Sequence, residues 1–208
     1  MSEAQITEEF LLALPKTDLH VHLDGSLRIN TLIELAKEYD VELPSYTEEG
    51  LRELVFKDRY QNLGEYLTGF QYTVGVLQSE LALERTAYEL AIDNQREGVR
   101  YLEVRFAPQL HVHEHMTAVA VLRAVNRGLE RAKKEFNASA QVADHGEPPF
   151  EYGIICSALR MFRTGFSEYY TALIKSHMYS PEKEVFKLGS LELARAAVVA
   201  RDEYGLPV

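Results

Sequence analysis

The pattern of hydrophobic and polar positions predicts three strands along the chain. The first contains Leu19, Val21 and Leu23, which alternate with polar residues at the period of two that sends neighbouring side chains to opposite faces. Residues 99–106 alternate in the same way, whereas residues 152–158 are apolar throughout, as expected for a strand covered on both faces. We therefore expect the aliphatic face of the first strand to pack against a layer of helices.

Apolar residues spaced three and four apart predict helices before, between and after these strands. We expect the helices at residues 1–14, 29–40, 47–55, 62–77, 79–97, 118–136, 166–177 and 181–204. Residues 137–150 are polar and lack periodicity, which predicts a loop, and residues 206–208 resemble the beginning of a fourth strand. Strands that alternate with helices in this order are typical of an α/β fold with a parallel sheet.

The second strand carries polar side chains that must point away from its aliphatic face. Tyr101, Glu103 and Arg105 share this second face because they are two residues apart. An unpaired buried charge is costly, so we expect Glu103 and Arg105 to pair with each other. We interpret both as groups that orient a site and not as catalytic residues.

Composition narrows the classes of function. The chain has 208 residues, 46% of them hydrophobic, which is enough for the core of one domain. Its net charge of −10 disfavours nucleic acid and anionic membrane surfaces as partners, because both attract clustered Lys and Arg. The single cysteine, Cys156, rules out an internal disulfide and favours a cytoplasmic location. We expect it to be a small buried hydrophobic residue, and we find no signal peptide or membrane-spanning segment.

His20 and His22 are candidate metal ligands. Two residues apart on a strand, their neutral imidazoles point to the same side and can reach one ion. Asp24 follows at the end of the strand, and Gly25 permits a sharp turn. A His-x-His pair also occurs as a hydrogen-bonded structural pair, so this pattern alone leaves both interpretations open.

A longer run around these histidines is more specific. From Pro15 to Arg28 the chain reads PKTDLHVHLDGSLR, which resembles the first-strand signature of the adenosine deaminase family of metal-dependent amidohydrolases. Residues 100–108, RYLEVRFAP, are similar to the second strand of that family. The resemblance implies a (β/α)8 barrel, of which residues 1–208 would be a single domain holding about the first three to four βα units. We expect the chain to stop before the fourth strand of the barrel.

The resemblance also implies a reaction, the hydrolysis of adenosine, and of deoxyadenosine, to inosine and ammonia in purine salvage. His20 and His22 would hold one Zn²⁺, His22 would face the substrate, and Asp24 would accept a hydrogen bond from a ribose hydroxyl. In the family the remaining ligands, the catalytic His and the proton-donating Glu lie on later strands, which would follow Val208. The resemblance therefore places no catalytic residue in this chain, which we expect to be inactive alone and to need the missing half of the barrel as a partner.

The helix predicted over residues 62–77 has an apolar stripe made of Leu63, Tyr66, Leu67 and Phe70. Such a stripe fits ordinary core packing. In adenosine deaminases a helix at this place covers the mouth of the site, so by resemblance the same four residues are candidates for the apolar wall of the substrate pocket.

Two points remain open from the sequence. Relatives that act on free adenine tend to have Glu at the position of Asp24, so this residue favours a nucleoside, with adenine, another 6-aminopurine or a non-catalytic half-barrel as alternatives. His111, His113 and His115 form a second group after the second strand. We expect them to be surface histidines of a loop, with His111 the one that is close enough to line the site.

Overall fold

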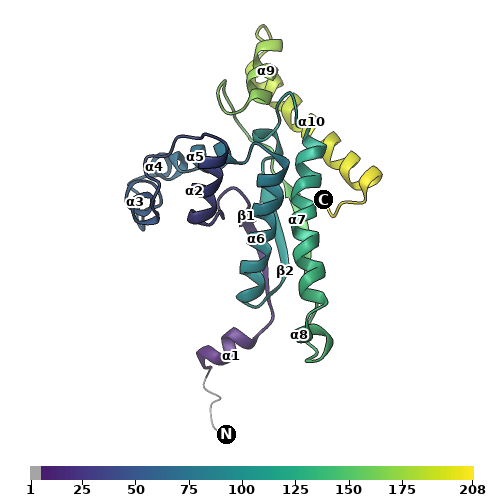
Figure 1. Ribbon diagram of the computed structural model, residues 1–208. Coiled ribbons are helices and arrows are strands. Elements are labelled where there is room, and N and C mark those ends of the chain that lie inside the picture. Colours follow the sequence, from purple (N-terminus) through teal and green to yellow (C-terminus); the bar gives the residue numbers. More distant parts are fainter. Residues whose placement is uncertain (1–5) are drawn as a thin grey trace.

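The computed structural model describes residues 6–208, and within them three parallel strands form the central sheet. The strands are β1 (Lys16–His22), β2 (Val99–Phe106) and β3 (Glu151–Cys156), and they lie in the order in which they occur along the chain. Figure 1 shows α6 and α7 lying along this sheet, with α2 to α5 to one side, α9 above the upper ends of α6 and α7, and α10 beside the upper part of α7. The parallel α/β fold predicted from the sequence is confirmed.

Helices lie where the apolar periodicity predicted them. They are α1 (Glu8–Ala13), α2 (Ile29–Glu38), α3 (Glu48–Leu54), α4 (Leu63–Thr68), α5 (Phe70–Val76), α6 (Glu80–Arg96), the 3-10 turn η1 (Pro108–Leu110), α7 (Ala118–Asn137), α8 (Ala140–Ala143), α9 (Glu168–Ser176) and α10 (Glu182–Tyr204). Of the helix expected over residues 1–14, residues 8–13 form α1, and residues 1–5 lie outside the described part of the chain. The loop expected over residues 137–150 contains the short helix α8.

The helix predicted over residues 62–77 is divided in two. Asn62 begins α4 by accepting a hydrogen bond from the backbone N–H of Glu65. At Gly69 the backbone hydrogen bonds span three residues, as in a 3-10 helix. The N–H of Gly69 donates to the oxygen of Tyr66, and the N–H of Tyr72 donates to the oxygen of Gly69. A Cβ added at Gly69 would lie in ordinary contact with Phe56 and Val55, so the junction of α4 and α5 packs beside the segment that follows α3.

The pairing of β1 with β2 is irregular, and this corrects one expectation. Asp18 pairs with Leu102 and Val21 with Val104, so β1 has one more residue than β2 between the two pairs. Such a bulge breaks the strict alternation of side chains. Leu19 is consequently 52% exposed and does not pack in the core, whereas Leu23 is fully buried as expected.

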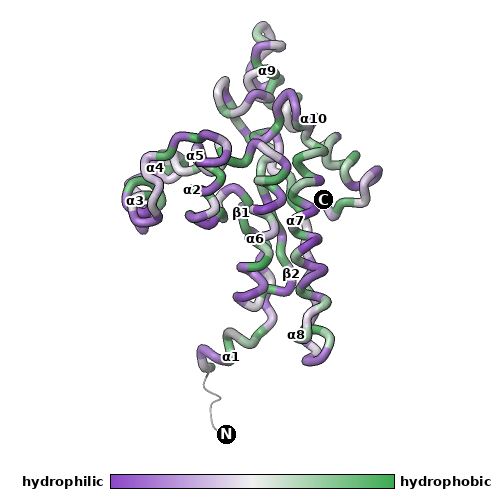
Figure 2. Tube along the Cα trace, viewed as in Figure 1, coloured by the Kyte–Doolittle hydropathy of each residue, from purple (hydrophilic) through white to green (hydrophobic). Residues whose placement is uncertain are grey.

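The core lies between the sheet and the helices α6 and α7. The side chains of β2 that face it, such as Leu102, Val104 and Phe106, are buried. The two helices touch closely at Gly128, where an added Cβ would lie only 2.1 Å from the backbone oxygen of Glu84. Figure 2 shows hydrophobic and hydrophilic stretches alternating along both helices, as expected when each buries one side.

The opposite face of the sheet is open and carries the polar residues of β2. Tyr101, Glu103 and Arg105 are each partly exposed there. Their pairing differs from our expectation: the Tyr101 hydroxyl donates to Glu103 at 3.2 Å, and Arg105 donates to the backbone oxygen of Leu19 at 2.9 Å. The bulge in β1 presents this oxygen to Arg105, so the guanidinium has a neutral acceptor instead of the carboxylate.

The segment after α10 returns to the sheet. Gly205 ends the helix with a left-handed backbone angle (φ 65°), and the N–H of Ile154 on β3 donates to the oxygen of Pro207 at 2.8 Å. Residues 206–208 thus lie beside β3, where the start of a fourth strand was expected.

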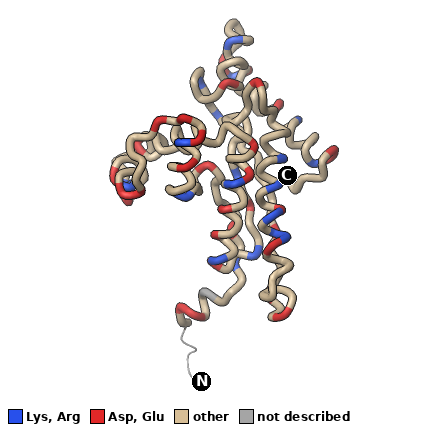
Figure 3. Tube along the Cα trace, viewed as in Figure 1, with Lys and Arg blue, Asp and Glu red and all other residues tan. Residues whose placement is uncertain are grey.

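Both acidic and basic residues lie along α6 and α7 (Figure 3). None of the helices within residues 6–208 is long and apolar enough to cross a membrane. Burial raises the pKa of the Cys156 thiol to about 11, which keeps it protonated, although the side chain is only partly buried.

Candidate functional site

The histidine pair lies at the carboxyl end of β1 on the open face of the sheet. The ring centres of His20 and His22 are 5.5 Å apart, and both side chains are exposed. The carboxylate of Asp18 accepts the backbone N–H of His20 at 3.0 Å, and the hydroxyl of Ser26 donates to the oxygen of His22 at 2.6 Å. Local hydrogen bonds therefore fix the backbone on both sides of the pair.

This geometry fits two ligands of one zinc ion. Zn–N bonds of about 2.0 Å at a tetrahedral angle would place two coordinating ring centres about 5 Å apart, close to the observed separation. Residues 6–208 contain no group of three or more His, Cys, Asp or Glu side chains arranged to hold a metal. His20 and His22 can thus supply part of a zinc site, and further ligands would have to come from outside this part of the chain.

Asp24 lies directly beyond the pair and is buried. Its Oδ1 atom is 3.8 Å from Nδ1 of His22, and only 5% of the residue is exposed. Burial raises the pKa of the Asp24 carboxyl, an effect that the neighbouring His22 opposes. Within the described residues Oδ1 has no hydrogen-bond partner, so a buried acceptor is available for a ligand hydroxyl.

A pocket opens beside Asp24. Asp24 and Gly25 line it from the β1 side, and Tyr66, Phe70 and Thr73 line it from α4 and α5. The Tyr66 and Phe70 rings meet edge to face, with centroids 5.7 Å apart, and form an aromatic wall.

The four residues of the predicted apolar stripe are placed differently. Tyr66 and Phe70 line the pocket, although Tyr66 remains 44% exposed. Leu63 and Leu67 are 70% and 50% exposed and do not line it. The structure therefore brings Asp24, Tyr66 and Phe70 together and leaves the two leucines at the surface.

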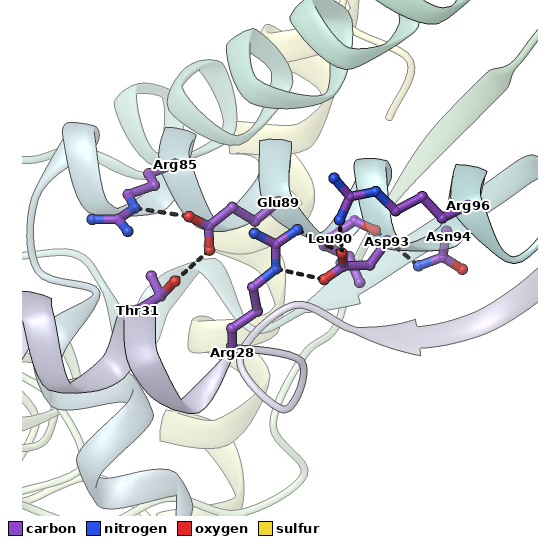
Figure 4. A network of polar contacts seen from close by, with 8 residues as sticks. All are labelled: Arg28, Thr31, Arg85, Glu89, Leu90, Asp93, Asn94 and Arg96. Atoms are coloured by element: carbon purple, nitrogen blue, oxygen red, sulfur yellow. Dashed lines mark hydrogen bonds and ion pairs between the residues drawn. The ribbon is translucent and has the colours of Figure 1, made fainter. Parts of the chain in front are cut away.

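A network of ion pairs, not anticipated from the sequence, anchors the turn that carries Asp24. Arg28, just before α2, donates two hydrogen bonds to the carboxylate of Asp93 on α6, at 2.7 and 2.5 Å. The Thr31 hydroxyl and Arg85 both donate to Glu89 (Figure 4). The start of α2, five residues after Asp24, is thereby attached to the helix layer. The contacts that join α2 to α6, Arg28–Asp93 and Thr31–Glu89, connect residues 65 and 58 positions apart, so no local pattern could indicate them.

The three histidines of the second group differ in burial, and only part of the expectation for them is correct. His111 is fully buried, which corrects the expectation of a surface histidine, and it does not line the pocket beside Asp24. Burial lowers its pKa to about 4. The side chain of His115 is 80% exposed, as expected, and His113 is partly buried.

A larger cavity, of about 440 Å³, lies at the opposite end of the sheet. It is bordered by Gln95, Arg100 and Glu147, and the guanidinium of Arg100 is already paired with Glu147 and placed over the ring of Phe136. Active sites of parallel barrels lie at the carboxyl ends of the strands, and this cavity is at the amino end of β2. We therefore place the candidate site at the histidine pair and Asp24.

Known proteins resemble the chain in both sequence and fold. The family model described as Adenosine deaminase matches residues 15–145. The adenosine deaminase of Vibrio atlanticus is 40% identical over 151 residues, which cover 73% of this chain and 42% of the relative. That of Shewanella pealeana is 46% identical over 127 residues, 61% of this chain and 38% of the relative. The chain thus spans less than half the length of these relatives.

Solved structures show the same fold at lower identity. An amidohydrolase from Burkholderia ambifaria with bound Zn superposes with a TM-score of 0.57 at 17% identity, covering 98% of this chain and 61% of that one. The N6-methyl-AMP deaminase from Arabidopsis thaliana superposes with a TM-score of 0.53 at 22% identity, covering 82% and 46%. These neighbours identify the architecture as part of an amidohydrolase-type (β/α) barrel.

Proposed function

The chain belongs to the adenosine deaminase family, and we propose that it forms the first half of a zinc-dependent barrel that hydrolyses adenosine, and deoxyadenosine, to inosine and ammonia in purine salvage. The observation that carries the proposal is the His20–His22 pair, spaced for one metal ion, beside the buried carboxylate of Asp24, whose Oδ1 atom has no hydrogen-bond partner among the described residues. The names of the matched relatives support adenosine as the substrate. Because the chain covers less than half of those relatives, the reaction would require the remaining half of the barrel, in a longer chain or as a separate piece.

Each of these residues has a defined task in the proposed reaction. His20 and His22 would hold the metal through neutral imidazoles, and their other ring nitrogens remain free to donate to orienting acceptors. The bound zinc would supply Lewis acidity that makes water nucleophilic near neutral pH. Asp24 is already buried, and its Oδ1 atom, which has no hydrogen-bond partner among the described residues, would accept a hydrogen bond from a ribose hydroxyl. The Nδ1 atom of His22 lies 3.8 Å from that oxygen.

The aromatic wall would complete the purine pocket. Tyr66 and Phe70 face Asp24 across the pocket and would cover the base, which excludes water and strengthens the charge interactions inside. Leu63 and Leu67 are exposed and would join this wall only if α4 turned toward the site. We place the protein in the cytoplasm, which its single cysteine supports.

The test is an assay of ammonia release and of the ultraviolet change of the purine. The 208-residue chain alone should show no turnover with zinc present. Coproduced with the second half of the Vibrio atlanticus relative, it should deaminate adenosine much faster than adenine. Asp24→Ala in that complex should reduce activity on adenosine, whereas His115→Ala, at an exposed loop position, should not.

Three outcomes would contradict the proposal. Turnover by the chain alone would show that it contains a complete site. Preference for adenine would exclude a ribose contact at Asp24. A folded complex that binds zinc but deaminates neither compound would favour the non-catalytic half-barrel.

A further inference from the structure

Two histidines that the proposed metal site does not use lie at the end of α5. The Nδ1 atom of His111 is 3.0 Å from the carbonyl oxygen of Leu77, and Nε2 of His113 is 3.1 Å from that of Gln78. A carbonyl oxygen can only accept, so both of these ring nitrogens must carry a proton. Nδ1 of His113 accepts the backbone N–H of His115 at 3.3 Å, which requires the same tautomer of His113.

The two acceptor carbonyls are consecutive and follow the last turn of α5. Leu77 is the C-cap of this helix, where backbone carbonyls lack partners within the helix. The side-chain amide of Gln78 donates in the other direction, to the oxygen of Leu110 at 3.3 Å, and also to Val74 within α5 at 2.7 Å. Side-chain hydrogen bonds thus join residues 77–78 to residues 110–113 in both directions, and we call this connection the clasp.

The helices α4 and α5 depend on such tertiary attachments. They have six and seven residues, and helices of this length are not stable in isolation. Figure 1 shows them in an arm with α2 and α3 beside the sheet, from which the chain returns to α6. Leu77 at the clasped end is fully buried, whereas α4 contains no buried residue. Within residues 63–77 burial is therefore concentrated toward the end of α5 next to the clasp, whereas α4 lies at the surface.

The orientation of α5 determines the shape of the pocket beside Asp24. Phe70, the first residue of α5, lies against the turn of β1, since a Cβ added to Gly25 would be 3.5 Å from the Phe70 ring. Phe70 and Val76, at the two ends of α5, are about 9 Å apart along the helix axis, so a small rotation at the clasp moves the ring markedly. Neither His111 nor His113 lines the pocket.

We infer that His111 and His113 are positioning residues, which hold the end of α5 and thereby place Phe70 in the aromatic wall opposite Asp24. The two imidazoles act at a distance from the substrate and would touch neither metal nor purine. Burial keeps His111 uncharged near neutral pH, so its donor to Leu77 is permanent under those conditions. The inference concerns the geometry of the pocket and holds whichever purine the site accepts.

Amide hydrogen exchange of the 208-residue chain tests the clasp without any turnover. His113→Leu removes one donor, and His113→Gln keeps an N–H near the position of Nε2. The net loss of one hydrogen bond corresponds to about fivefold faster exchange through local opening, or about 1 kcal/mol. We expect this increase in residues 63–76 for His113→Leu, exchange within about twofold of the parent for His113→Gln, and no change in residues 80–96 for either. His115→Leu, outside the clasp, should match the parent.

A fluorescence measurement connects the clasp to the pocket. The chain contains no tryptophan, so Phe70→Trp introduces a single indole into the aromatic wall. In that background His113→Leu should shift the indole emission to longer wavelength and increase its quenching by acrylamide. The His113→Gln variant should show the same emission wavelength and the same quenching as Phe70→Trp alone. His111→Leu and His111→Asn repeat the comparison at the buried position, where Asn keeps a donor close to Nδ1.

The results that overturn the inference are specific. Unchanged exchange in residues 63–76 for His113→Leu would show that the clasp does not hold the arm. Equal acceleration in residues 80–96 would show general destabilisation instead of local positioning. An indole that does not respond to His113→Leu would show that the clasp does not set the wall of the pocket.

Discussion

Acidification should destabilise the protein through His111, and the size of the effect follows from its burial. The ring is fully buried and its Nε2 atom has no partner among the described residues, so a second proton would find no acceptor there. Burial lowers its pKa from the ordinary value of 6.5 to about 4. Below pH 6.5 the unfolded chain therefore binds a proton at this position that the folded chain does not bind until about pH 4.

The pKa of His111 in the unfolded chain, 6.5, and in the folded chain, about 4, determine the sign and the size of the change in stability with pH. The stability that the neutral His111 provides is complete above pH 6.5 and is lost progressively as the pH falls toward 4. Between pH 7 and pH 5 this loss amounts to about 2 kcal/mol in the free energy of unfolding. Asp24 acts in the opposite direction, because burial raises its pKa and the folded state binds its proton more readily than the unfolded state as the pH falls.

A comparison of variants isolates the contribution of His111. His111→Asn removes the titrating ring and keeps an N–H donor for Leu77, while His115→Asn serves as the exposed control. Urea denaturation at pH 7 and pH 5 should show the parent and His115→Asn losing about 2 kcal/mol more than His111→Asn. His111→Asn can be less stable at both pH values through lost packing, so the difference between the two pH values is the quantity compared. Equal losses in all three proteins would refute the reasoning.

Four further substitutions have defined outcomes. His20→Ala should weaken zinc binding at least tenfold in calorimetric titration, because one of the two imidazoles of the pair is lost. Gly128→Ala should lower the free energy of unfolding by about 3 kcal/mol in urea, since its Cβ would meet the backbone of α6, and any stabilisation would contradict the described helix contact. Asp93→Ala should cost about 1 kcal/mol in the same assay, because it breaks a half-exposed bidentate pair. Asp24→Asn should stabilise the chain at pH 7 while impairing nucleoside binding, since it removes a charge whose burial outweighs the support from His22 and the backbone and whose Oδ1 atom has no donor among the described residues; a loss of stability would show that this support outweighs the cost of burial.

The parts of the fold that the sequence predicted well are those determined by neighbouring residues. β2 covers the residues over which apolar and polar side chains alternate, as predicted. Thr117 caps α7 by accepting the N–H of Ala120. The helices predicted to end at residues 97 and 204 end at Arg96 and Tyr204, and Gly98 and Gly205 follow them with positive φ. Each of these features depends on interactions within a few residues.

The errors concern interactions between distant segments. His111 was expected at the surface because it follows the second strand in a connecting loop, but its partner is Leu77, 34 residues earlier. Leu19 was expected in the core, and the bulge that exposes it depends on the pairing of β1 with β2. Arg105 was expected to pair with Glu103, and the same bulge provides the oxygen of Leu19 instead. Alternation along one strand contains no information about the register with the next.

The candidate site combines both kinds of information, which explains why the sequence located it only in part. The spacing of His20 and His22 is local to β1 and could be predicted, whereas the aromatic wall requires α4 and α5 to fold back over Gly25. The unpaired Oδ1 atom of Asp24 could be recognised only in the structure, because it depends on how the chain folds around the carboxylate. A buried acceptor atom without a donor reduces stability, and folded proteins rarely retain one where nothing binds. Its place next to two exposed imidazoles is therefore stronger support for a ligand site than the His-x-His spacing by itself.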